Sequence, residues 1–214
     1  MTRHTVRVAA GIAAALGLLT ACNSKAPGTA EPPASSPASA PSNSSTASGG
    51  PSAGSGPKVP APLSTQALLS DPCSALGDSD ATGIGLAAPG RPFQGDQGAA
   101  KDLKGCQWVS AEFQGLNTAG IVPLTPNKNG ISDIYAQKNQ EAYFEVTTLA
   151  GYPAVHAAKT DDRANGHCEL WVGVTDQLAV SVSVGLGTGQ GRSNPCGAAD
   201  KVGTAMVNHL KTAS

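Results

Sequence analysis

The sequence predicts an α+β fold: one antiparallel β-sheet, with helices from both ends of the domain packed on it and two disulfides. In two successive segments, 170–174 and 178–186, apolar residues alternate with small or polar ones, as in a β-hairpin with one buried face. Asn194-Pro195 then precedes a segment, 195–211, whose apolar residues recur at helical spacing. The disulfides are expected from four cysteines in the same region: Cys73, Cys106, Cys168 and Cys196.

Shorter patterns predict the elements before the hairpin. Ser70-Asp71-Pro72-Cys73 has the N-cap and first-turn proline of a helix start, and Asp78-Ser79-Asp80 caps a second short helix through Ile84. Residues 87–101 are rich in Gly, Pro and Gln and are expected to form a loop.

Two strands and a short helix are expected between that loop and the hairpin. The strands cover 106–113 and 118–124, and Pro123 and Pro126 place the second at a sheet edge or end it early. The remaining segments are a helix at 131–138 and strands at 143–148 and 154–158.

The first 21 residues have the pattern of a bacterial lipoprotein signal peptide. Arg3 and Arg7 precede an apolar run, Val8 to Leu19, that is too short to span a bilayer. Leu19-Thr20-Ala21-Cys22 follows, in the order of a lipobox, where the thiol accepts a diacylglyceryl group. We therefore expect the mature chain to begin at Cys22 and to be anchored by lipid to the outer face of the plasma membrane.

A low-complexity segment separates the anchor from the domain. Residues 22–62 are dominated by Ser, Pro, Ala and Gly, and they hold too few large apolar side chains to offset the entropy of folding. We expect a disordered stalk over 22–62 and the α+β domain over 63–214.

Cysteine spacing leaves the disulfide pairing open. An exported chain with four domain cysteines favours two bridges over a metal site, because no Cys-x-x-Cys pair is present. Sequential pairing, which we favour, closes two loops of about 30 residues, and each bridge would stabilise the domain by about 3–4 kcal/mol on the chain-entropy model. The alternative joins Cys73 to Cys196, both after Pro, and Cys106 to Cys168, both near a Trp.

Charge and motifs indicate neither nucleic-acid binding nor catalysis. Without the signal peptide the chain has 12 basic and 15 acidic residues, and no basic cluster that could follow phosphates. His156, His167 and His209 lie in no nucleophile motif, so we expect no catalytic, cofactor or metal residues. The prediction is a non-enzymatic binding or accessory domain; the alternative is an enzyme acting on cell-envelope material.

One surface is a candidate for binding. Alternation in the hairpin places Trp171, Ser181 and Ser183 on the face opposite its Leu and Val side chains. Aromatic and small polar residues together suit recognition, so an envelope protein or an apolar small ligand is the expected partner.

Five motifs together are similar to those of one known family. They are Asp71-Pro72-Cys73, Gly105-Cys106-Gln107-Trp108, Gly151-Tyr152-Pro153-Ala154-Val155, the Cys168 that opens the hairpin, and Asn194-Pro195-Cys196. Over about residues 65–212 the chain resembles the actinobacterial lipoprotein family catalogued as domain of unknown function 3558. The resemblance implies an extracytoplasmic lipoprotein with paired cysteines and assigns no reaction. The segment after Cys73 departs from the family in having fewer aliphatic residues and more Gly and Asp.

Overall fold

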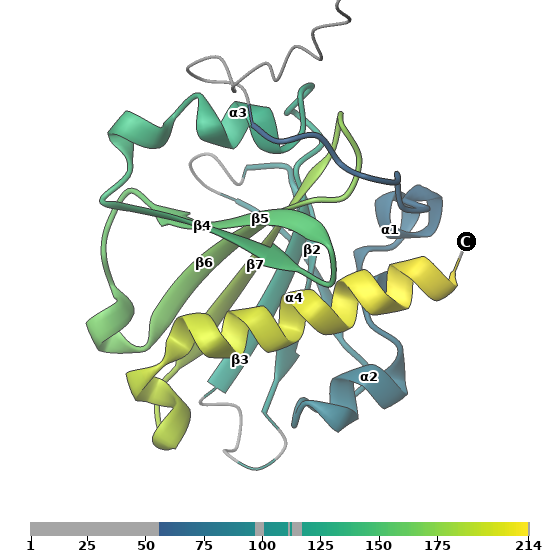
Figure 1. Ribbon diagram of the computed structural model, residues 1–214. Helices are drawn as coiled ribbons and strands as arrows, with labels where there is room; N and C mark the ends of the chain where they lie inside the picture. Colours follow the sequence, from purple (N-terminus) through teal and green to yellow (C-terminus); the bar gives the residue numbers. More distant parts are fainter. Residues whose placement is uncertain (1–55, 97–100, 111, 113–116, 214) are drawn as a thin grey trace, which may run out of the picture. The chain divides into compact units, whose positions relative to one another are not determined.

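A computed structural model describes residues 56–96, 101–110, 112 and 117–213 (Figure 1). Seven strands form one antiparallel sheet in the order β1-β2-β3-β7-β6-β5-β4. The strands are β1 Arg91–Gln94, β2 Lys104–Val109, β3 Asn117–Pro123, β4 Tyr143–Leu149, β5 Tyr152–Ala158, β6 His167–Gly173 and β7 Ala179–Leu186. The α-helices are α1 Gln66–Ser70, α2 Asp78–Gly83, α3 Ile131–Tyr135 and α4 Pro195–Thr212. Short 3-10 turns are η1 Pro72–Ala75, η3 Lys138–Gln140, η4 Arg163–Asn165 and η5 Gln190–Ser193. The predicted α+β class is confirmed.

The hairpin β6–β7 lies near the middle of the sheet and supplies the main core. Its register pairs Leu170 with Val182 and Val172 with Val180, and all four side chains are buried. Helix α4 crosses this face of the sheet (Figure 1). A Cβ on Gly203 would lie 2.8–2.9 Å from Leu149 and Leu170 side-chain carbons, so glycine permits the close approach of α4.

A second apolar cluster lies on the opposite face of the sheet. Helix α3 contributes Ile131 and Ile134, which join Val155 and Ala157 of β5 and Ala179 of β7. Both faces are therefore covered in part, the first by α4 with the N-terminal helices and the second by α3.

The N-terminal turns form where the capping residues predict them. The Asp71 carboxylate accepts a hydrogen bond from Cys73 N at 3.0 Å, at the start of η1. Asp80 of α2 accepts from Gly77 N and is hydrogen-bonded to His209 Nδ1 at 2.8 Å, which ties α2 to α4. The two short helical segments expected here are η1, which is a 3-10 turn, and α2.

One sequence expectation was wrong, and only one of the two alternatives for the second predicted strand holds. Residues 91–94, expected in a loop, form edge strand β1; all four of its residues are exposed, so no apolar alternation marked it. Strand β3 lies between β2 and β7 rather than at an edge. Pro123 is its last residue, and the next amide, Leu124 N, bonds to Ala179 O, so the proline does end the strand.

Several expectations fall outside the described residues. They concern the signal peptide, Cys22, most of the stalk and Phe113 at the end of the second predicted strand. Within the described part of the chain, no helix combines the length and apolarity that crossing a membrane requires.

Candidate functional site

The four domain cysteines form two disulfides between sequence neighbours. Cys73 bonds to Cys106 and Cys168 bonds to Cys196, at sequence separations of 33 and 28. The favoured sequential pairing is confirmed. The first bridge joins η1 to β2, and the second joins β6 to the start of α4.

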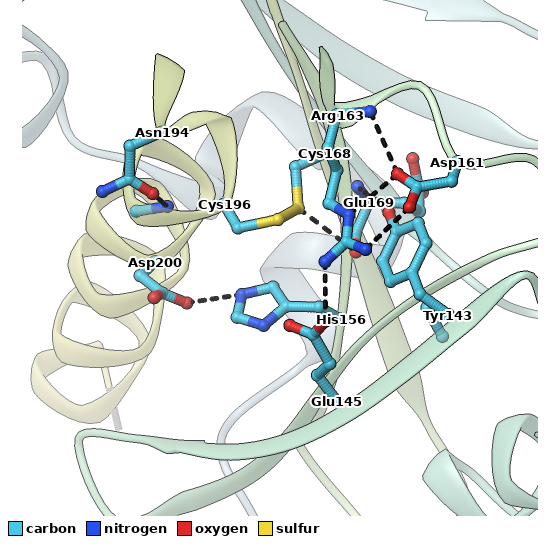
Figure 2. Close-up of a disulfide and its surroundings, with 12 residues drawn as sticks. Tyr143, Glu145, His156, Asp161, Arg163, Cys168, Glu169, Asn194, Cys196 and Asp200 are labelled. Atoms are coloured by element: carbon cyan, nitrogen blue, oxygen red, sulfur yellow. Dashed lines mark hydrogen bonds and ion pairs between the residues drawn. A yellow bond between two sulfur atoms is a disulfide. The ribbon is translucent and has the colours of Figure 1, made fainter. Parts of the chain in front are cut away.

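A buried histidine lies beside the second bridge (Figure 2). The Nε2 atom of His156, on β5, is 2.8 Å from Asp200 Oδ1 on α4. A ligating atom of His156 and the sulfurs of Cys168 and Cys196 all lie within 4.8 Å of one another. In the described structure both sulfurs are bonded to each other, so this set presents no free thiol as a metal ligand or nucleophile.

An arginine network borders the same bridge (Figure 2). Arg163 donates to Asp161 at 2.7–2.8 Å and to Glu145 at 2.6 Å, and its guanidinium lies 4.1 Å from the Tyr143 ring centre. Hydrogen bonding from Arg163 lowers the pKa of Asp161 to about 2. The Arg163 guanidinium thus holds the polar side chains around Asp161 together.

The candidate binding residues of the hairpin lie where strands β5 and β6 separate. The two strands pair only from His156–Leu170 to Ala154–Val172. Beyond that point Ala157 O accepts from the indole Nε1 of Trp171 at 2.8 Å, and Glu169 N donates to Tyr143 Oη at 3.3 Å. Side chains therefore satisfy the backbone groups that the interrupted ladder leaves unpaired.

None of the three predicted surface residues is fully exposed. Trp171 and Ser183 are half-buried, and Ser181 is buried and donates to the Glu169 carboxylate. The structure brings these residues together on one face, and their docking role stays a prediction.

Glu169 is a residue of this face that the sequence reasoning missed. Burial raises the pKa of its carboxyl, and the hydrogen bond from Ser181 opposes part of that shift. The signal was available: Glu169 is the only charged residue between Cys168 and Gly173, and strand alternation puts it on the same face as Trp171.

We expect Glu169→Gln to stabilise the domain at neutral pH. Because the folded-state pKa is raised, the folded protein binds the proton more tightly than the unfolded chain does. This carboxyl's contribution to stability therefore falls as pH rises from its ordinary pKa to the raised one, and stays low above it. Thermal melts of both proteins are recorded from about pH 4 to about pH 8. The melting temperatures of Glu169→Gln and of the wild type should become equal at the acid end of this range. Glu112→Gln, at an exposed carboxylate, is the control; an equal gain there would contradict the assignment to Glu169.

A cavity of about 600 Å³ lies between the end of α2, helix α4 and the sheet. Its volume is in the range of small-molecule sites, about 300–1,000 Å³. The walls combine residues from distant parts of the chain. The apolar ones are Ile84, Leu86, Ala119, Val184, Leu186, Ala198 and Val202.

The cavity lining also includes six polar or charged residues: Ser110, Glu112, Asn117, Thr118, Thr188 and Lys201. Asn117 is buried and accepts a hydrogen bond from Thr188 N at 3.2 Å. The two charged lining residues, Glu112 and Lys201, are exposed to solvent. The lining contains no histidine or cysteine among the described residues. The sequence did not predict this cavity, because no continuous segment forms it.

Comparisons with known proteins provide a family and no function. A family model described as "Protein of unknown function (DUF3558)" matches residues 17–209. No curated protein and no solved structure matches the chain significantly.

Proposed function

The chain belongs to the DUF3558 family of unknown function, so we propose a role from its own geometry: a non-enzymatic domain that binds an apolar small molecule beside α4. The observation that carries this proposal is the 600 Å³ cavity with predominantly aliphatic walls. Burial of a ligand's apolar surface in such a cavity stabilises the complex by about 25 cal/mol per Å² of surface removed from water. Charges only at the margins suit a ligand with an apolar body and a polar end.

The proposed location is the outer face of the plasma membrane. The lipobox ending at Cys22 supports attachment by lipid, and the Ser/Pro/Ala/Gly segment supports a flexible stalk. Two disulfides in the folded part agree with an oxidising compartment. On this proposal the domain is an actinobacterial lipoprotein that holds its ligand in the cell envelope.

Filling the cavity tests the binding role. Ala198 is a half-buried cavity residue on α4, so Ala198→Leu should place extra carbons inside the space. We expect 1-anilinonaphthalene-8-sulfonate to bind the wild-type protein, and at least about tenfold more weakly to the variant, a loss of about 1.4 kcal/mol. Fluorescence titration measures both affinities.

Ala205→Leu is the matched control, because Ala205 is a half-buried alanine of α4 that does not line the cavity. Its affinity for the probe should equal that of the wild type. Equal affinities in all three proteins, with similar melting temperatures, would contradict binding in this cavity.

Substitution of Cys22 tests the anchor. Cys22→Ala removes the only thiol of the lipobox, so the protein should leave the detergent phase of a Triton X-114 partition almost completely when expressed in a lipoprotein-processing bacterium. Ser24→Ala, two residues into the stalk, should partition like the wild type. Detergent partitioning of Cys22→Ala at the wild-type level would show that lipid on this cysteine is not the anchor.

A further inference from the structure

The two disulfides of the domain have very different surroundings. We propose that Cys168–Cys196 is a thiol–disulfide exchange site, which accepts two electrons from a dithiol, whereas Cys73–Cys106 is structural. The proposal is separate from ligand binding in the cavity. It rests on the position of Cys196 at the start of a long helix and on Arg192 and His156 beside the bridge.

Cys196 lies in the first turn of an 18-residue helix. Pro195 begins α4, the Asn194 side chain caps it by accepting from Gly197 N at 3.0 Å, and the first turn contains no acidic residue. The positive end of a long helix stabilises a thiolate that forms when the bridge opens. Cys73 does not lie at the start of a long helix, because η1 has only four residues.

Both cysteines of the bridge line a pocket, and Cys196 is the more exposed of the two. Cys196 is half-buried and lines a pocket of about 410 Å³, whereas Cys168 is only 3 % exposed. An incoming sulfur therefore meets Cys196 first. In the other bridge Cys73 is half-buried as well, whereas Cys106 is fully buried, and the backbone at Gly90 lies close over the sulfur of Cys106 and over Trp108. Exposure therefore does not by itself separate the two bridges.

The pocket around Cys196 is lined by two guanidinium groups, Arg163 and Arg192, and one carboxylate, Glu145. Arg163 is neutralised by Asp161 and Glu145, while Arg192 has no ion-pair partner among the described residues. An unpaired guanidinium in the pocket favours an anionic sulfur at Cys196 and attracts an incoming thiolate.

His156 can move protons at the bridge. Its ring lies within 4.8 Å of both sulfurs, and its Nε2 is hydrogen-bonded to Asp200 (Figure 2). The Asp200 carboxylate orients the ring through this hydrogen bond. The charged groups around the bridge are Glu145, Asp161, Arg163 and Arg192 near Cys196, Asp200 beside His156, and Lys159, Asp162 and Glu169 near Cys168.

The exchange balances with a dithiol as reductant. One thiolate of the dithiol attacks Cys196 Sγ, the Cys168–Cys196 bond breaks, and its electron pair leaves on Cys168 Sγ, which takes a proton from the His156 imidazolium. The second thiol gives its proton to His156 and attacks the mixed disulfide at the dithiol's own sulfur, which releases the Cys196 thiolate. The dithiol is oxidised to a disulfide, and the protein bridge is reduced by two electrons.

Loop entropy does not separate the two bridges, because the closed loops of 28 and 33 residues are similar in length. Differences in their ease of reduction must therefore come from the surroundings. Cys73–Cys106 is therefore an internal control for the proposed exchange site at Cys168–Cys196.

The test incubates the folded protein in buffers that contain reduced and oxidised dithiothreitol at a series of ratios. After an acid quench, differential alkylation and peptide mass spectrometry identify which cysteines are reduced. Cys168–Cys196 should open at a reduced-to-oxidised ratio at least about tenfold lower than Cys73–Cys106, and after partial reduction iodoacetamide should label Cys196 ahead of Cys168. Opening of both bridges at the same ratio, or of Cys73–Cys106 first, would overturn the proposal.

Two variants test the charged neighbours. Arg192→Ala should raise the ratio needed to open Cys168–Cys196 and shift the pH profile of Cys196 alkylation upward, while Arg91→Ala, an equally exposed arginine on β1, should leave both unchanged. His156→Ala should slow the opening by dithiothreitol at least about tenfold, in the range of general acid–base catalysis. If His156→Ala fails to fold, the comparison of Arg192→Ala with Arg91→Ala still tests the proposal. The same opening ratio and the same alkylation profile in those two variants would refute the role of the pocket.

Discussion

Leu170→Ala is expected to lower the free energy of unfolding by about 2–5 kcal/mol. Leu170 is fully buried in β6, opposite Val182 of β7 and beneath the close approach of α4 at Gly203. A paired strand and a glycine contact leave the neighbours little freedom to collapse into the space, so the cost of the cavity adds to the lost transfer energy. Urea unfolding measures the change as a lower midpoint at unchanged slope.

Val146→Ala is the control for this truncation. Val146 is also a strand residue, but 62 % of its surface is exposed on edge strand β4, so its change in stability should stay within about 0.5 kcal/mol. If the two variants were equally stable, Leu170 could not belong to the core that α4 covers.

Loss of the Cys73–Cys106 bridge is the second large effect. The double substitution Cys73→Ala/Cys106→Ala opens a loop of 33 residues, and the chain-entropy model assigns such a loop about 3–4 kcal/mol. The melting temperature should fall by roughly 10 °C for a domain of about 150 residues. Calorimetry under oxidising conditions measures the fall.

Peptide mapping must show that Cys168–Cys196 remains intact in this variant, so that the loss belongs to one bridge. Reductant strong enough to open both bridges should then lower the melting temperature of the wild type more than that of the variant. A variant as stable as the wild type would mean that η1 does not need its link to β2.

The described residues differ in how far local pattern determined their structure. The β6–β7 hairpin and α4 were predictable because burial on one face leaves a period in the sequence, of two residues for Leu170–Val172 and of about 3.6 for Ala199–Val202–Met206. The turn at Asp71 was predictable because its capping hydrogen bond is local. Strand β1 was not, because an exposed edge strand needs no apolar period.

The position of β3 and the raised pKa of Glu169 depended on contacts across the sheet. A proline in a strand indicates an edge only when the missing N–H faces a neighbour, and Pro123 avoids the conflict by ending the strand. Glu169 lies in a plain strand pattern, and its raised pKa arises only because β7 and Tyr143 enclose it where β5 and β6 separate.

By itself, the sequence determined the α+β class, the lipobox hypothesis at Cys22 and the presence of four cysteines fit for two bridges, since composition and short spacings carry these features. Only the tertiary structure decided which cysteines pair, which residues surround each bridge, and that a cavity exists. Leu86, Ala119, Val184 and Val202 meet at that cavity although more than 100 residues separate the first from the last. Such a site has no local signature, because its walls form only when the sheet order and the crossing of α4 bring distant segments into contact.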